Sequence, residues 1–293
     1  VIVGGSATLR QQGSNLSFGN LALNVNTGTY NLGIGTEALG YQTSGDRNVG
    51  VGYQAGRNNV TGDYNTFMGF SAGRGTTSGV YSRSVGIGND ALYTINTGDK
   101  NTAVGDSALR MLDKGEKSTA VGHNAGYYAT GSYNTFIGTH AGQGGTTSAP
   151  YSSGQYNVAI GYEALKGFTT AGKAVAIGYG AGKVHQTANW AVYIGYKAGY
   201  DVTSGAQNVL IGGEAGTNLT TADRNIAIGG AALQTATTGG SNTVVGDNAG
   251  WSATTASGSV FIGRLAGGNI DSSNANVAIG QQALENVDAG SDG

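Results

Sequence analysis

The stretch Asn157–Leu165 reads NVAIGYEAL, and close relatives of it recur along the chain. They read NVGVGYQAG at 48–56, NTAVGDSAL at 101–109, NIAIGGAAL at 225–233 and NVAIGQQAL at 276–284. The residues before the glycine alternate in period two, with β-branched side chains on one side, which is typical of a short strand. The motif therefore predicts a short strand, a glycine and a tight return of the chain, used repeatedly.

The glycine of the motif, taken as position 0, marks a regular repeat. It occurs 17 times, at Gly4, Gly19, Gly35, Gly52, Gly69, Gly88, Gly105, Gly122, Gly138, Gly161, Gly178, Gly195, Gly212, Gly229, Gly246, Gly263 and Gly280. From Gly161 onward the spacing is always 17 residues, and position +3 is alanine in every repeat. A repeat of this length is too short for a strand with a packed helix, and no helical periodicity is visible. We therefore predict an all-β fold, a single parallel β-solenoid or β-roll of about 17 coils.

The whole chain, 1–293, is predicted to be one solenoid domain. The spacing widens to 23 residues before Gly161, where the segment 143–156 contains the only proline, Pro150. Insertions of this kind usually form loops outside the core of a repeat protein.

The composition restricts the function classes. The 293 residues include 55 glycines, one proline and no cysteine, with 11% charged residues and a net charge of −2. One proline argues against collagen, and abundant β-branched and aromatic residues argue against disorder. The net charge predicts no nucleic-acid binding, and no apolar run approaches the ~20 residues of a membrane span. The absence of cysteine fits an exported protein that does not depend on disulfides.

The repeat also suggests which positions face the core. Positions −3 and −1 are mostly aliphatic or β-branched and share a face, so we expect them inside, with the alanine at +3. Asparagine at −4, present in eleven repeats, is expected to form a ladder of stacked amides.

Position −2 would then face outward, although its residues are almost all apolar or small. Its bulky members include Phe67, Phe136, Tyr193, Leu210, Val244 and Phe261. A continuous apolar stripe predicts lateral self-association. The alternative is that each strand is covered by the long turn of its own coil.

The two ends of the sequence are in phase with the repeat. Val1, Ile2 and Val3 occupy strand positions, and Gly293 stands where the next repeat would begin. The ends are therefore expected to stack head to tail into a filament. Alternatively, the sequence is a segment of a longer repeat protein.

Few residues suggest a small-molecule site. Tyr162, Tyr179 and Tyr196 share position +1 of successive coils and could contact a glycan, or simply stack on one another. His123 and His140 occupy neighbouring repeats, but solvated surface residues are the better interpretation than a metal pair, and single carboxylates at +1 or +2 are expected to be solvated turn residues. We predict no catalytic residue, no metal and no cofactor, and therefore no enzyme.

The motifs NVAIG, NTAVG and STAVG, each followed three residues later by alanine, resemble the head repeats of trimeric autotransporter adhesins and related bacteriophage tail-fibre shafts. The resemblance covers nearly the whole chain, although the period is longer than in adhesin heads. It implies a left-handed parallel β-roll, association of three chains, and a location outside the cell, on its surface or on a virion.

These observations favour a structural protein that self-assembles into an extracellular or virion fibre. The alternative is an adhesin or tail-fibre shaft that binds host-surface glycans through its tyrosines and its insert. Ice binding is a third hypothesis, since threonine recurs at −3 (Thr66, Thr102, Thr119, Thr135 and Thr243), but that position is expected to face the core.

Overall fold

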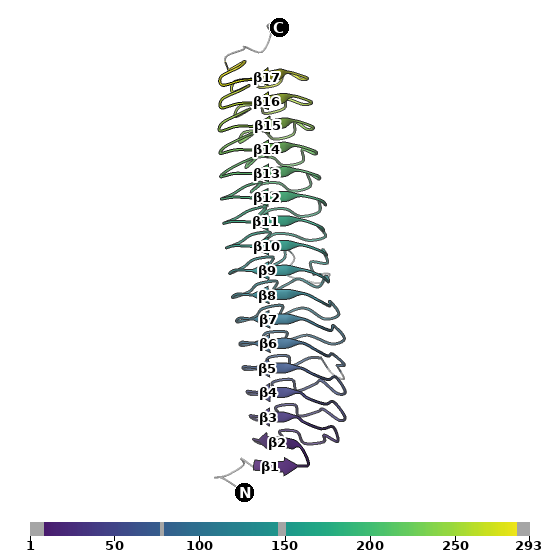
Figure 1. Ribbon diagram of the computed structural model, residues 1–293. Coiled ribbons are helices and arrows are strands. Elements are labelled where there is room, and N and C mark those ends of the chain that lie inside the picture. Colours follow the sequence, from purple (N-terminus) through teal and green to yellow (C-terminus); the bar gives the residue numbers. More distant parts are fainter. Residues whose placement is uncertain (1–8, 77–78, 146–150, 286–293) are drawn as a thin grey trace. The chain divides into compact units, whose positions relative to one another are not determined.

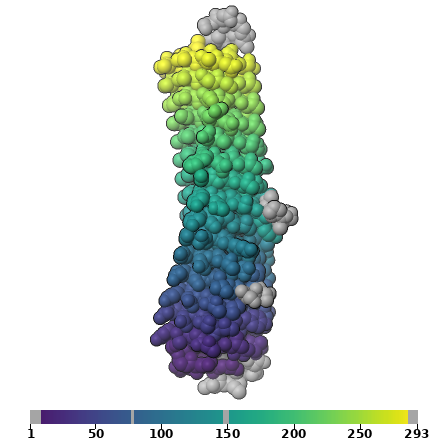
Figure 2. Space-filling view, turned by 90° about the vertical axis from the view of Figure 1, so that its right-hand side faces the viewer, coloured from purple at the N-terminus to yellow at the C-terminus, as the bar shows by residue number. Residues whose placement is uncertain are grey.

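The computed structural model describes residues 9–76, 79–145 and 151–285 (Figure 1). The chain divides into two compact units, one of residues 1–143 and 147–153 and the other of residues 144–146 and 154–293. The division falls within the predicted insert at 143–156. Figure 2 shows that, within each unit, successive coils form narrow bands in the order of the sequence.

The described residues contain strands and turns and no helix. The first unit contains β1 (Leu9–Gln12), β2 (Asn15–Phe18), β3 (Leu32–Ile34), β4 (Val49–Val51), β5 (Thr66–Met68), β6 (Val85–Ile87), β7 (Thr102–Val104), β8 (Thr119–Val121) and β9 (Thr135–Ile137). The second contains β10 (Val158–Ile160), β11 (Val175–Ile177), β12 (Val192–Ile194), β13 (Val209–Ile211), β14 (Ile226–Ile228), β15 (Thr243–Val245), β16 (Val260–Ile262) and β17 (Val277–Ile279).

Within each unit every coil strand pairs in parallel with the next, and equivalent repeat positions face each other. Val158 pairs with Val175 and Ile160 with Ile177, and the same register continues to β17. The prediction of an all-β parallel solenoid with a 17-residue coil is confirmed. The predicted strand and glycine of the first coil, around Gly4, lie outside the described residues, and β1 runs antiparallel to β2.

Left-handed backbone conformations allow the turn after each strand to bond in both directions along the stack. Residues at +2 and +4 have positive φ, 57° at Glu37 and 51° at Leu39, for example. The Glu37 N–H donates to the carbonyl of Asn20 in the preceding coil, whereas the Leu39 N–H donates to Ala55 in the following one. Backbone groups of the turn are thus satisfied by neighbouring coils, which offsets the steric cost of these conformations.

Glycine at position 0 is required because the coils approach one another closely there. Gly161 has a φ of +126°, which side-chain-bearing residues rarely adopt. A Cβ on this residue would lie 2.6 Å from the carbonyl oxygen of Gly178 in the next coil.

The asparagine ladder at −4 uses mainly the backbone rather than amide-to-amide bonds. Asn48 Oδ1 accepts a hydrogen bond from the backbone N–H of Asn65 at 2.9 Å, and its Nδ2 donates to the carbonyl of Gly62 at 2.8 Å. A direct amide contact is added where Asn65 Nδ2 donates to Asn48 Oδ1 at 2.9 Å. Each buried asparagine therefore joins two coils and one turn.

The predicted orientation of the strands is wrong. The predicted self-association stripe at −2 is fully buried, with Phe67, Phe136, Tyr193, Leu210, Val244 and Phe261 each 0% exposed. Positions −3 and −1 face outward instead, because side chains alternate along a strand and position −2 takes the inner face. The alternative, that each coil covers its own position −2, is confirmed.

Side chains at positions −2 and +4 fill the same part of the core, so a large residue at one position is accompanied by a small residue at the other. Where −2 is phenylalanine or tyrosine, +4 is glycine in the same coil and in the preceding one, and where +4 is leucine, −2 is glycine, alanine or serine. A Cβ on Gly56 would lie 2.9 Å from Phe67 Cδ2, and one on Gly50 would lie 2.8 Å from Leu39 Cγ. The two positions therefore share one space beside the invariant alanine at +3, as close packing requires.

Candidate interaction surfaces

The outward face of the strands forms an uncharged surface in each unit. Its two columns, positions −3 and −1, contain only aliphatic residues, threonine, methionine and phenylalanine in β2–β17. We call this surface the strand face. Ile177 is 36% exposed, Ile228 38% and Ile262 39%. Equivalent side chains repeat at the spacing of neighbouring strands, about 4.8 Å.

The threonines at −3 belong to the strand face. Thr66, Thr102, Thr119, Thr135 and Thr243 are half-buried on its outer side. The expectation that they face the core is wrong, which removes that objection to ice binding. Their partners at −1 are Met68, Val104, Val121, Ile137 and Val245, so no rank of paired threonines is formed.

The predicted tyrosine column is present in the second unit. The rings of Tyr162 and Tyr179 stack at 5.3 Å and 16°, and those of Tyr179 and Tyr196 at 5.4 Å and 20°. The three residues are 44%, 47% and 50% exposed. Cross-coil stacking is confirmed, and contact with a glycan remains a prediction.

The histidines take different environments. His123 and His140 meet edge to face at 5.4 Å, and no cluster that could hold a metal ion is found within the described ranges. His185, in contrast, is fully buried in the second unit. Its Nε2 lies 3.0 Å from the carbonyl oxygen of Ala188, and its Nδ1 lies 3.1 Å from the hydroxyl of Tyr193. Burial lowers the pKa of His185 to about 4, and raises that of Tyr193.

Several carboxylates at +2 form ion pairs rather than isolated solvated groups. Glu163 pairs with Lys166 at 2.6 Å and with Lys183 at 2.8 Å. Burial alone would raise the pKa of Glu163, but hydrogen bonds from both lysines hold it below its ordinary value. Glu163 is therefore held as a structural anion.

A cation column at +5 faces these carboxylates and was missed by the sequence analysis. An acid at +2 of one coil pairs with a cation at +5 of the next: Glu37 with Arg57 at 2.6 Å and Asp90 with Arg110 at 3.2 Å. Tyrosines occupy the same edge, and Arg57 lies 4.4 Å from the ring centroid of Tyr41. The spacing of 20 residues between acid and cation is the signal that could have revealed the column.

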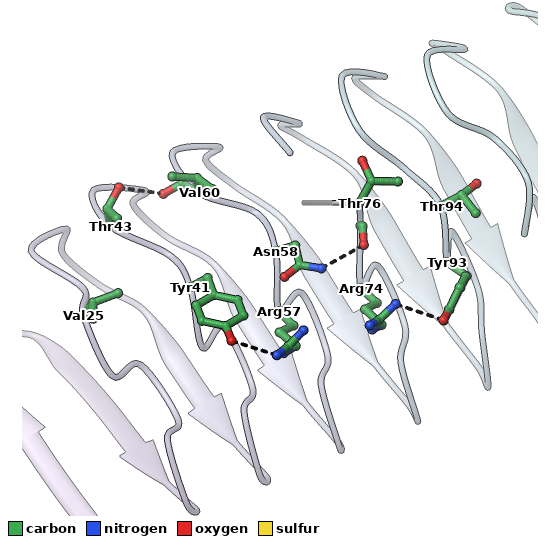
Figure 3. Close-up of a pocket in the computed structure, with 11 residues that line it drawn as sticks. Val25, Tyr41, Thr43, Arg57, Asn58, Val60, Arg74, Thr76, Tyr93 and Thr94 are labelled. Carbon is green, nitrogen blue, oxygen red and sulfur yellow. Dashed lines mark hydrogen bonds between the residues drawn. The ribbon is translucent and has the colours of Figure 1, made fainter. Parts of the chain in front are cut away.

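A groove of about 730 Å³ runs beside this column in the first unit (Figure 3). Tyr41, Arg57, Arg74 and Tyr93 follow one another along successive coils on one side. Thr43 and Thr94 are among the residues that complete the lining. We call this cavity the Arg–Tyr groove.

The remaining sequence predictions concern the ends, the insert and the membrane. Val1, Ile2, Val3 and Gly293 lie outside the described residues, as does 146–150 of the insert. Within the described part of the chain, no helix has the length and apolar character needed to cross a bilayer.

Comparison of the chain with protein-family models, with curated proteins and with solved structures finds no match.

Proposed function

We propose that this chain is a structural protein that assembles side by side with further copies of itself, as a subunit of an extracellular or virion fibre. The observation that carries the proposal is the strand face, whose two columns contain no charged residue from β2 to β17. Extended uncharged apolar surfaces usually mark sites of association.

The strand face also has a periodicity that favours a like partner. Its ridges repeat once per coil, at about 4.8 Å, and a surface with the same repeat can fill its grooves along the full length. A second copy of this chain has that repeat. These observations support lateral association rather than head-to-tail stacking. The strand β1 runs antiparallel to β2, so it does not continue the parallel ladder of the first unit. The location outside the cell or on a virion rests on the resemblance to adhesin heads and tail-fibre shafts.

Lysine substitutions on the strand face are expected to prevent assembly without unfolding the protein. The double variant Ile177→Lys/Ile211→Lys places two ammonium groups in the proposed interface, where each would lose its hydration. We expect it to sediment as a single small species at a concentration where the wild type forms larger particles, as measured by analytical ultracentrifugation and electron microscopy.

The control is Gln186→Lys, which adds one of these two charges at an exposed turn of the coil that contains Ile177. It should assemble like the wild type. All variants should keep the wild-type melting temperature within a few degrees, because the sites are outward. A wild type that stays a single species at high concentration, or a double variant that assembles normally, would contradict the proposal.

Adhesion to host-surface glycans is the second candidate function. It is supported by the three stacked, half-exposed tyrosines at +1, because aromatic rings offer apolar faces with a polar hydroxyl. A glycan array probed with the full chain tests it, and blank results across many glycans would count against it.

A further inference from the structure

The Arg–Tyr groove contains a cation that the repeat leaves without an acidic partner. At the equivalent positions of other coils, a carboxylate at +2 faces the cation at +5, as in Glu37–Arg57, Asp90–Arg110 and Glu163–Lys183. Opposite Arg74 this position is Gln54, whose Oε1 accepts a hydrogen bond from Arg74 Nε at 3.1 Å. Of the described residues, no carboxylate lies within ion-pair distance of Arg74.

Arg74 is nevertheless held in a fixed orientation. Its Nη1 donates to the hydroxyl of Tyr93 at 2.9 Å, and its guanidinium carbon lies 5.2 Å from the centroid of that ring. Gln54 is fixed in turn, because its Nε2 donates to Glu37 at 2.7 Å. The Nη2 group of Arg74 has no hydrogen-bond partner among the described residues, so it can donate to a ligand oxygen. An oriented guanidinium with free N–H groups suits a carboxylate.

The rest of the groove presents groups that suit a sugar. The Oγ1 atoms of Thr43 and Thr94 donate to the carbonyls of Val60 and Arg110, so they are left to accept hydrogen bonds from ligand hydroxyls. The half-exposed Tyr41 adds an aromatic ring near Thr43, whereas Thr94 lies at the opposite end of the groove (Figure 3). The volume of about 730 Å³ lies within the range of small-ligand sites, and is sufficient for a short oligosaccharide.

We propose that the Arg–Tyr groove binds an acidic oligosaccharide, with a sugar carboxylate on Arg74 and a neighbouring sugar ring along Tyr41. This site is separate from the strand face and from the stacked tyrosines of the second unit. A nucleic acid is a poorer ligand, because phosphate-backbone binding requires several unpaired cations and the chain has a net charge of −2.

Calorimetric titration of the full chain with tetragalacturonate tests the proposal. We expect the wild type to bind it, with an affinity that falls as salt is raised, and not to bind the fully methyl-esterified form of the same oligosaccharide. Arg74→Gln should weaken binding at least tenfold. Gln54→Glu should do the same, because it places on Arg74 the carboxylate that the other coils have.

The matched control is Lys183→Gln, at the same repeat position but paired with Glu163 in the second unit, and it should bind within twofold of the wild type. Gln54→Glu introduces an ion pair that this fold already uses elsewhere, so loss of binding with an unchanged melting curve is not explained by unfolding. The proposal is overturned if tetragalacturonate does not bind the wild type, or if both groove variants bind like the wild type. Equal binding of a hexaglutamate peptide would also overturn it, since the site would then recognise charge without the sugar.

Discussion

Replacing Phe261 by alanine is expected to lower the free energy of unfolding of the second unit by about 3–5 kcal/mol. Phe261 is the inward residue of β16 and is 0% exposed. Its ring occupies space that the glycines at +4 leave open: a Cβ on Gly250 would lie 3.0 Å from its Cδ2, and one on Gly267 would lie 2.5 Å from its Cδ1. Because Gly250 and Gly267 have no side chains, these two positions bring nothing to fill the cavity left by alanine.

The neighbouring residue in the same strand provides the matched control. Ile262 faces outward and is 39% exposed, so Ile262→Ala should cost only about 1 kcal/mol. Urea unfolding followed by circular dichroism measures both variants at concentrations where the chain is a single species. Equal costs for the two substitutions would contradict the inward orientation of position −2.

The shared space of positions −2 and +4 leads to a prediction for Gly267, the +4 residue of the coil that contains Phe261. Gly267→Leu alone should be strongly destabilising, because its side chain would overlap the ring of Phe261. Combined with Phe261→Ala it recreates the pair found at Ala159 and Leu165, both 0% exposed. The double variant should therefore be more stable than either single variant, and strictly additive losses would show that the positions do not share one space.

The sequence predicts the coil, its period and its parallel register, because a 17-residue spacing forces equivalent residues into columns. It does not predict the face of the strand, because −3, −2 and −1 are nearly all apolar or small, and alternation alone does not say which side is covered. The decisive signal was present but unused: bulky residues at −2 and leucine at +4 exclude each other within a coil. Such exclusion is expected only of side chains that fill the same core.

The repeat register also explains why the tyrosine column was predicted from the sequence and the cation column was not. The tyrosine column lies directly after the invariant glycine, where the register is fixed, so Tyr162, Tyr179 and Tyr196 could be aligned by counting. Arg57 and Arg74 lie at +5, in the same fixed register, but the residue type at +5 varies from coil to coil, so the cation column is recognised only through the acids at +2 of the preceding coil. The orientation of Arg74 towards a groove needs the three-dimensional structure.

Lowering the pH from 7.5 to 5.0 is expected to destabilise the second unit by about 2 kcal/mol through His185 alone. In the folded chain Nε2–H must donate to the carbonyl of Ala188, and Nδ1 accepts from the hydroxyl of Tyr193, so the ring is neutral. Its pKa is about 4 when folded, because burial disfavours the charged ring, against an ordinary value of 6.5. Between these values the unfolded chain binds more protons, so stability is complete above pH 6.5 and is lost as the pH falls towards 4.

The variant His185→Gln isolates this contribution from the carboxylates that titrate in the same range. Glutamine offers one donor and one acceptor to Ala188 and Tyr193 and does not titrate, so its unfolding free energy should change less between the two pH values, by about 2 kcal/mol. His123→Gln changes an exposed histidine and should keep the wild-type pH dependence. Urea unfolding read by the fluorescence of Trp190 and Trp251, which both lie in the second unit, reports the transition of that unit. If His185→Gln keeps the pH dependence of the wild type, His185 is not held neutral by the core, and the packing around Tyr193 differs from that described.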